Sequence, residues 1–487
     1  MESRKITRRR LLRAMAGTAG ILLLASCKPT PTPTPAPKPV GPTKPAATTV
    51  PPTPAPPKTV KLVVWTQAGS TDNLRAENAV PAAKALNEVL QKSGRNITIV
   101  VEPVVDTASW GDYKKKYALA ADAGQAPDIV VAGHEDCAVW AEPGYIVPLD
   151  DCIKSQKEFE DVIPRLWDSM VYKGKKWAVP CDTEARPMYF SMDRFKALGW
   201  SEAQIAELPK KIEKGEFILD DMIATAKEAI AKGVVQKGYG YWHRTTKGGD
   251  FLQYYHAYGG RIYDDKSGKL VTVKAAMKEF FAFQRRCVTE GITPANYIGT
   301  EGKIWHDAVS HNKCLFFNGG VWNWSDWAAN YVKDLGGRDY LQKNIGFALQ
   351  PAGKRGTPGA TLSHPLIYMV SSKKATGKEN QDLACELLAK MTTTELANAH
   401  SIRSTHLAIL KSQLDSPAYK AEHILTGTAY MANFAFYQPN HASFGIWWDI
   451  AFKGMQDAEN GAKPVEQAVE DVIKQQQAEL GDQLIVE

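Results

Sequence analysis

The sequence lacks the long apolar runs and the catalytic motifs that would assign it at once to a class. No run approaches the ~20 apolar residues of a membrane-spanning helix, which excludes a polytopic membrane protein. No GxGxxG, GxxxxGK(S/T), HExxH or GxSxG pattern is present, and no CxxC pattern or histidine spacing indicates a zinc site. No repeat of about 20 to 50 residues points to a solenoid or propeller. We therefore expect no metal and no cofactor.

Positive charge is concentrated at the N-terminus. The 487 residues carry 59 Lys or Arg against 53 Asp or Glu, a net charge of +6. Residues 1–58 hold ten of these bases and one of these acids, so the remaining 429 residues carry 49 bases against 52 acids, or −3. The body therefore lacks the basic excess that binds phosphate backbones, and we expect no nucleic acid partner. Its length predicts two or three lobes with their own cores.

The N-terminus has the pattern of a lipoprotein export signal. Residues 1–26 begin with Lys and Arg, continue with a short apolar run and end in small residues. Leu24, Ala25, Ser26 and Cys27 resemble a bacterial lipobox, so Cys27 is predicted to carry lipid and anchor the protein to the cell membrane. Residues 7–13 resemble a twin-arginine signal, with an ordinary Sec signal as the alternative. Residues 27–58 are then a lipidated cysteine followed by an extended Pro/Thr-rich tether.

Six cysteines remain after Cys27, an even number that permits disulfides in an exported protein. Cys137 and Cys152 are the preferred pair because they are near each other in the sequence. The alternative is that these cysteines are small buried apolar residues.

Strands and helices alternate in the first part of the body. Apolar runs predict strands at 60–65, 97–104 and 129–131, separated by helical patterns at about 73–92 and 112–123. This alternation favours βαβ units and a parallel sheet whose faces are both covered. Further along, we expect helices at about 219–232, 251–258, 273–290, 380–391 and 464–480, and strands at 313–317, 345–348 and 366–370.

Aromatic side chains in polar loops are the main positive feature. All 13 tryptophans lie in the body, and some cluster in FNGGVWNWSDW and FGIWWDI. A flat indole can stack on the apolar face of a sugar ring, while carboxylates and amides bind the hydroxyls at its rim. Core packing is the alternative for any single tryptophan, but Asn318, Gly319 and Gly320 end a strand just before Trp322 and place it in a loop.

Several motifs occur together in one order. They are AGQAPDIVVAGHED, AEPGYIVPLDD, KGKKWAVPCDTEARPMYFSMDRFKALGW, HAYGGRIYDD, FNGGVWNWS and ENGAKPVEQAVEDV. Together they resemble family 1 extracellular solute-binding proteins, the receptors of ABC sugar importers, and within them the maltose-binding protein group. The resemblance covers nearly all of residues 59–487. It implies an α/β fold of the periplasmic-binding-protein type, with two lobes, a hinge and a cleft between the lobes.

The resemblance also implies lobe boundaries and a binding site. Lobe 1 is expected at 59–182 plus about 366–414, and lobe 2 at about 187–360 plus 415–487, with crossings near 182–186 and 361–365. The matching positions place acids at Glu135, beside Asp136, and at Glu184, and stacking indoles at Trp322 and Trp448. Other ligand-binding candidates at loops or strand ends are Trp65, Trp242, Asn318, Gln67, Trp110, His243 and His364. The family's charged pair in the first loop falls near Gly69 and Ser70, so the sugar is not assumed to be maltose.

The expected function is that of a lipid-anchored, extracytoplasmic, monomeric receptor that is not an enzyme. It would bind a sugar or oligosaccharide and deliver it to an ABC permease. Two alternatives stay open: a surface enzyme that degrades polysaccharide with a pair of carboxylates, and a receptor for a solute other than sugar.

Overall fold

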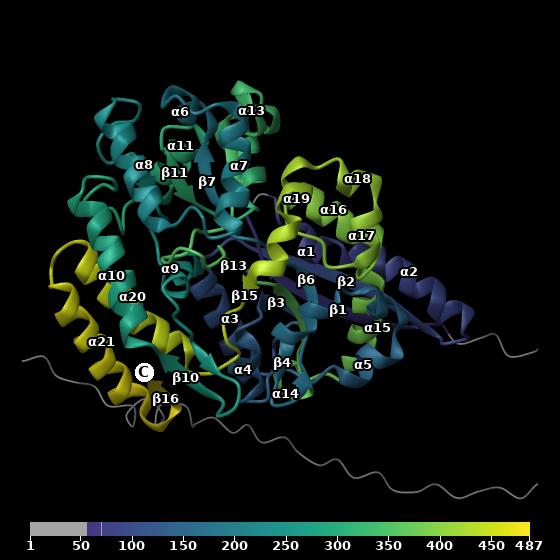
Figure 1. The fold of residues 1–487 in the computed structure, drawn as a ribbon. Helices are drawn as coiled ribbons and strands as arrows, with labels where there is room; N and C mark the ends of the chain where they lie inside the picture. The colour runs from purple at the N-terminus through teal and green to yellow at the C-terminus, as the bar shows by residue number, and fades with distance from the viewer. Residues whose placement is uncertain (1–55, 70) are drawn as a thin grey trace, which may run out of the picture. The chain divides into compact units, whose positions relative to one another are not determined.

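The two largest β-sheets organise residues 56–69 and 71–487, the part of the chain described by the structure, a computed structural model (Figure 1). The predicted export signal, the lipidated Cys27 and almost all of the tether lie outside the described residues. None of the helices within the described ranges has both the length and the apolar content to cross a bilayer.

The first sheet has five strands in the order β2-β1-β3-β14-β6. Their bounds are β1 (Lys58–Gln67), β2 (Ile97–Asp106), β3 (Ile129–Gly133), β6 (Val179–Asp182) and β14 (Leu366–Val370). Strand β1 runs parallel to β2 and β3, which confirms the predicted parallel units. Strand β14 is antiparallel to both of its neighbours, so the sheet is mixed.

Helices cover both faces of this sheet. Helices α2 (Ala79–Lys92) and α15 (Gln381–Met391) pack against each other, and their core also contains Ile129 and Val131 of β3. The side chains between them, Val130 and Ala132, lie in a second core with α3 (Trp110–Asp122). Since successive side chains of a strand point to opposite faces, this division explains why β3 is apolar throughout.

The helix expected at 73–92 is divided. Helix α1 (Leu74–Glu77) ends at Asn78, and α2 begins with Ala79. Pro81 lies in the first turn of α2, where a missing N–H removes no intrahelical hydrogen bond. Pro81 therefore favours a new helix that starts at Ala79, because a proline fits the first turn of a helix but not the interior of one long helix from 73 to 92.

The second sheet has the order β12-β7-β11-β8. Its strands are β7 (Met188–Ser191), β8 (Tyr241–Trp242), β11 (Phe316–Asn318) and β12 (Ile345–Ala348). The helices α6 (Met192–Ala197), α7 (Glu202–Glu213), α8 (Leu219–Ala231), α9 (Leu252–Ala257), α11 (Gly302–Ser310) and α13 (Arg338–Asn344) share its large apolar core.

Three long helices far apart in sequence lie side by side in this second part: α10 (Lys274–Thr289), α20 (Phe444–Glu459) and α21 (Val465–Leu480) (Figure 1). Below them, β16 (Leu484–Val486) pairs with β10 (Lys269–Thr272), which pairs with β9 (Tyr263–Asp264). The helices at 219–232, 251–258, 273–290, 380–391 and 464–480 are thus confirmed to within one or two residues.

The chain passes between the two sheets more than once. Residues 183–187 connect β6 of the first sheet to β7 of the second, and residues 349–365 connect β12 back to β14. Within the latter, β13 (Thr361–Leu362) pairs with β15 (Ala435–Phe436). The return path after β14 includes α16 (Thr394–Ser404), which contacts β6 of the first sheet and α12 (Asn323–Asp326) of the second part.

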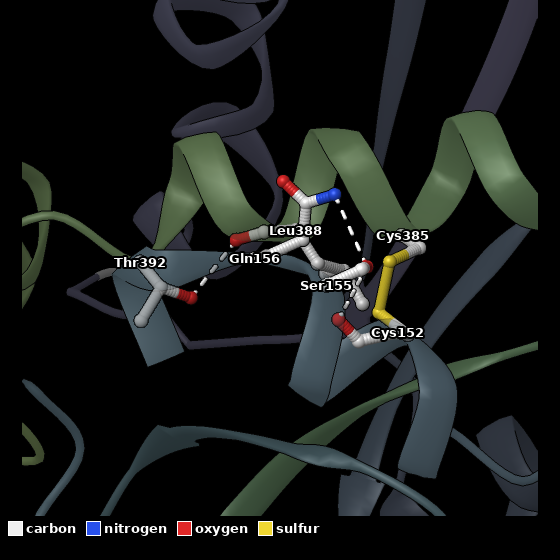
Figure 2. Close-up of a disulfide and its surroundings, with 6 residues drawn as sticks. All are labelled: Cys152, Ser155, Gln156, Cys385, Leu388 and Thr392. Atoms are coloured by element: carbon white, nitrogen blue, oxygen red, sulfur yellow. Dashed lines mark hydrogen bonds between the residues drawn. A yellow bond between two sulfur atoms is a disulfide. The ribbon is translucent and has the colours of Figure 1, made fainter. Parts of the chain in front are cut away.

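The disulfide joins Cys152 to Cys385, so the preferred pairing of Cys137 with Cys152 is wrong (Figure 2). Cys152 lies in α5 (Asp150–Ser155) and Cys385 in α15, with their Cα atoms 5.8 Å apart. Cys137 lies in α4 (Asp136–Ala141) and is a buried thiol in the core beneath α3, which matches the alternative interpretation. The prediction from sequence proximity was wrong because Cys137 of α4 and Cys152 of α5 pack in different cores.

Candidate functional site

Glu135 lies in the loop after β3 and carries a dense set of ionic contacts. Its Oε2 is 2.6 Å from Nε2 of His364, and its Oε1 is 3.0 Å from Nζ of Lys114. Lys114 of α3 also lies 2.7 Å from Oδ2 of Asp136. His364 comes from the segment that precedes β14, so the contact joins that segment to the end of β3. We call His134, Glu135, Asp136, Lys114 and His364 the Glu135 group.

Opposite charges set the ionisation of this group. Burial alone would raise the pKa of Glu135, but His364 and Lys114 outweigh it and hold that pKa well below its usual range. Burial acts to lower the pKa of His364, yet the Glu135 carboxylate raises it overall. For Asp136, burial and the neighbouring Glu135 raise the pKa to about 6 against the effect of Lys114. The group is therefore charged, with His134 and Asp136 buried and Lys114, Glu135 and His364 half-buried.

A second group surrounds Arg186, two residues after Glu184. Nε of Arg186 donates to Oε1 of Glu184 at 2.8 Å, and Nη1 donates to Oδ2 of Asp250 at 2.9 Å. The guanidinium lies over the indole of Trp322, 4.9 Å from the ring centroid. We call Glu184, Arg186 and Asp250 the Arg186 group. Sequence reasoning found Glu184 but not its two partners, since a buried cation between two acids leaves no local pattern.

The Glu135 and Arg186 groups are neighbours. The Glu184 carboxylate is close enough to help raise the pKa of His364, and burial raises the pKa of Glu184 itself despite Arg186. Glu135, His364, Glu184, Arg186 and Trp322 therefore lie in one region, which we call the array. Its members come from the first sheet, from two crossing segments and from the loop that follows β11 of the second sheet.

The loop that carries Trp322 depends on Gly320. A Cβ placed on Gly320 would lie 1.6 Å from the Trp322 ring, so only glycine allows the indole to fold back over this backbone. The Gly320 N–H donates to Oδ1 of Asn323 at 2.9 Å, which fixes the start of α12. Trp322 is half-buried, and its ring lies nearly parallel to that of His406 at 6.2 Å. The predicted loop position of Trp322 is confirmed.

A third group is fully buried around Asp182, at the end of β6. Oδ2 of Asp182 accepts from Nε of Arg75 and lies next to Nε2 of His400, at 2.8 Å in each case. Nη2 of Arg75 is 3.1 Å from Nε2 of His406. Burial opposes the charge of Asp182, but Arg75 and the two histidines hold its pKa far below the usual range. We call Arg75, Asp182, His400 and His406 the Asp182 group.

The other candidates have partners outside this array. Trp448 of α20 is buried and packs on Phe452, and Trp242 is buried beside Tyr239 and Tyr297. Asn318 is buried, and its Nδ2 donates to Oε1 of Gln350 at 2.8 Å. Trp65 is half-buried in β1, with Lys116 over its ring.

The remaining candidates have structural partners. Nε2 of Gln67 donates to the Ala108 carbonyl at 3.1 Å. Trp110 packs edge-on against Tyr113, and buried His243 lies 3.4 Å from Glu459. Trp448 and Trp242 therefore belong to the apolar core around the second sheet, which is the alternative stated above for any single tryptophan. Asn318 is a buried polar residue beside that core.

The two-sheet architecture, with polar and aromatic side chains gathered where the chain crosses between the sheets, is that of a two-lobed binding protein. The family model of the bacterial extracellular solute-binding proteins matches residues 74–397, about two thirds of the chain. The chain therefore belongs to the bacterial extracellular solute-binding protein family. This confirms the resemblance seen in the sequence.

Individual relatives are distant in sequence but similar in fold. The chain is 22% identical to a maltotriose-binding protein of Pyrococcus abyssi over 378 residues, which are 76% of this chain and 73% of that protein. The GacH receptor of Streptomyces glaucescens, solved unliganded and with acarbose, aligns with a TM-score of 0.66 at 18% identity, over 87% of this chain and 99% of its own. Maltose-bound MalE3 of T. maritima aligns with a TM-score of 0.63 at 18% identity, over 85% of this chain and 98% of its own. The α/β, two-lobed fold predicted from the sequence is thus confirmed.

Proposed function

We propose that this protein is an extracytoplasmic receptor that binds a sugar or oligosaccharide between its lobes and delivers it to an ABC permease. The observation that carries the proposal is the array from Glu135 to Trp322, which offers carboxylates and an indole at the crossing segments. Such a set matches the rim hydroxyls and the apolar face of a sugar ring. The binding of maltotriose, acarbose and maltose by similar proteins supports this ligand class.

In this proposal the lobes have the boundaries expected from the sequence, and closure of the lobes replaces water around the ligand. Glu135 accepts hydroxyl hydrogen bonds and Trp322 stacks on the ring, whereas Glu184 acts by holding Arg186 over Trp322. Trp448, Trp242 and Asn318 support the second lobe from within. No bond is made or broken, and lipid on Cys27 keeps the receptor, as a monomer, near the permease.

Calorimetry with a panel of oligosaccharides tests the proposal. We expect at least one of them to bind, and Trp322→Ala and Glu135→Gln each to weaken its affinity about tenfold, the equivalent of about 1.4 kcal/mol. Trp200→Ala is the matched control, because Trp200 is also half-buried but packs on Phe195 of α6.

Failure to bind any member of the panel, with both site variants behaving like the parent chain, would contradict the proposal. Release of products from a polysaccharide, lost in Glu135→Gln, would favour an enzyme instead.

A further inference from the structure

Two histidines and a carboxylate in the Glu135 group lie close enough to bind one ion together. One nitrogen of His134, one of His364 and one oxygen of Glu135 all lie within 4.8 Å of one another, and the two imidazole rings are 5.2 Å apart at 60°. We propose that these three side chains form a binding site for a divalent transition-metal ion of the Zn²⁺ class. Two imidazole nitrogens and one carboxylate oxygen are a ligand set that such ions prefer.

The hydrogen bonds of His134 fix which of its nitrogens faces the site. Nε2 lies 3.0 Å from the carbonyl oxygen of Gln438, and because a carbonyl can only accept, Nε2 must carry the proton. In the neutral ring Nδ1 then has a lone pair and no proton. His134 is fully buried, and its Nδ1 has no hydrogen-bond partner while lying 3.9 Å from Oε2 of Glu135. A buried lone pair without a donor calls for an electron-pair acceptor at that point.

The hydrogen bond from His134 to Gln438 is also of the kind that metal-binding histidines usually make. A ligating imidazole commonly donates its other N–H to a backbone carbonyl, which fixes the ring and its tautomer. Glu135 is arranged similarly: Lys114 binds Oε1, whereas Oε2 faces His364. The three ligand atoms are thus oriented from behind by Gln438 and Lys114, and a modest adjustment brings them to the ~2.0–2.2 Å metal distances.

A second group of side chains has the right atoms for a metal ion, but its other contacts exclude one. Within residues 56–69 and 71–487, Cys181, Asp182 and His400 meet the same distance condition. There, however, Nε of Arg75 donates to the same Asp182 oxygen that faces His400. A permanent cation therefore occupies the position that an ion would need, and we assign no site to this group.

The proposed ion would act on the crossing segments. It would tie the loop after β3 to His364 of one crossing segment, while Gln438, just after β15, holds His134 from behind. Three protein ligands leave a fourth position for water or for an oxygen of a bound molecule. The inference does not rest on the proposed sugar, because the ligands and their geometry are those of the protein alone.

The test is a calorimetric titration of the purified full-length chain, freed of metal with a chelator, with ZnCl₂ and no sugar. We expect one ion per chain, and we expect His134→Ala and His364→Ala each to weaken binding about 100-fold or more, since even the loss of a residue that only orients a ligand costs up to that. Cobalt(II) should give visible absorption bands in the parent chain that both variants lose. His311→Ala is the control, since His311 pairs with Asp307 on α11, away from the site.

No zinc binding, or binding that is equal in the parent and in His364→Ala, would overturn the inference. Zinc binding lost in His311→Ala would overturn it as well, because the ion would then lie on α11. If thermal melting shows that His134→Ala fails to fold, zinc binding is compared in His364→Ala and Glu135→Gln instead, because both positions are half-buried. A chain that binds zinc at these residues and no sugar would uphold this inference and contradict the proposed function alone.

Discussion

The Asp182 group and the Glu135 group are both built from acids, histidines and a base near the crossing segments, yet they differ in how their charges are held. Asp182 is almost fully buried, and Arg75 and His400 both contact its Oδ2. Glu135 is half-buried and shares its two oxygens between His364 and Lys114, which are themselves partly exposed. The first group is suited to holding α1, β6 and α16 together, and the second can exchange a protein partner for a ligand.

Removal of the Asp182 charge is the largest expected effect. Asp182→Asn removes the closest acidic partner of buried Arg75 and leaves only Asp72, at 3.5 Å. Breaking one side of a buried pair costs about 3–5 kcal/mol. We expect the free energy of unfolding, measured by urea denaturation, to fall by that amount. Glu135→Gln should cost about 1 kcal/mol or less, because water can reach His364 and Lys114. Equal losses in the two variants would remove the distinction between the groups.

Reduction of the disulfide should come next. The Cys152–Cys385 bond closes a separation of 233 residues, and native disulfides typically contribute about 2–4 kcal/mol by limiting the unfolded chain. Replacing both cysteines by serine should lower the free energy of unfolding by that amount. Since neither α5 nor α15 carries a member of either group, the loss should be the same in the Glu135→Gln background. Replacement of Cys137, which forms no disulfide, is the control.

Acid should weaken the Asp182 group through His406. Burial lowers the pKa of His406 from 6.5 to about 4. Positive charge on Arg75 and His400 also opposes protonation of His406, whereas the negative charges of Asp182 and Asp72 favour it. Between these values the unfolded chain binds a proton that the folded chain does not, so stability falls as the pH drops from 6.5 towards 4.

The variant His406→Gln should lose less stability than the parent over this range, by about 2–3 kcal/mol. Urea denaturation at pH 7 and at pH 4.5 measures the difference, and His134 and His306, which share the low pKa of about 4, contribute equally to both chains. Parallel losses in parent and variant would show that His406 does not titrate as described.

Gly320→Ala should lower stability less than the loss of the Asp182 charge or of the disulfide. The added Cβ would collide with the Trp322 ring, and overpacking of this kind costs about 1–3 kcal/mol. Displacement of the indole from Arg186 should also weaken ligand binding to the level of Trp322→Ala. Gly302→Ala, where a Cβ meets nothing within 4 Å, is the control and should stay within about 0.5 kcal/mol of the parent. Unchanged stability and affinity in Gly320→Ala would contradict this prediction, because the loop that carries Trp322 would then accommodate a Cβ at no cost.

The sequence predicted the parts of the molecule that depend on local patterns. Apolar periodicity located the strands and most helices, and Gly319 and Gly320 placed Trp322 in a loop. It did not reveal contacts between distant segments. Arg75 and Asp182 are 107 residues apart, and the two disulfide cysteines are separated by 233. No spacing rule connects such pairs, because the folded topology alone brings them together.

The candidate site shows the same division. Glu135 and Trp322 were located from motifs, and the structure joins them through His364, Glu184 and Arg186. Trp448, Trp242 and Asn318 are candidates by residue type and position, and all three are buried in the structure. Burial distinguishes an indole in the core from one that can stack on a ligand, and burial depends on the whole fold. Arg186 and Asp250 had no local signal, since each is defined by the partner that it neutralises.

A crystal structure of the chain grown with the oligosaccharide that binds best by calorimetry is the most direct test of the account. We predict a sugar ring stacked on Trp322 and a hydroxyl within about 2.6–3.2 Å of a Glu135 oxygen, between the two sheets. A sugar bound elsewhere, with Glu135 and Trp322 keeping their present protein contacts, would contradict the account.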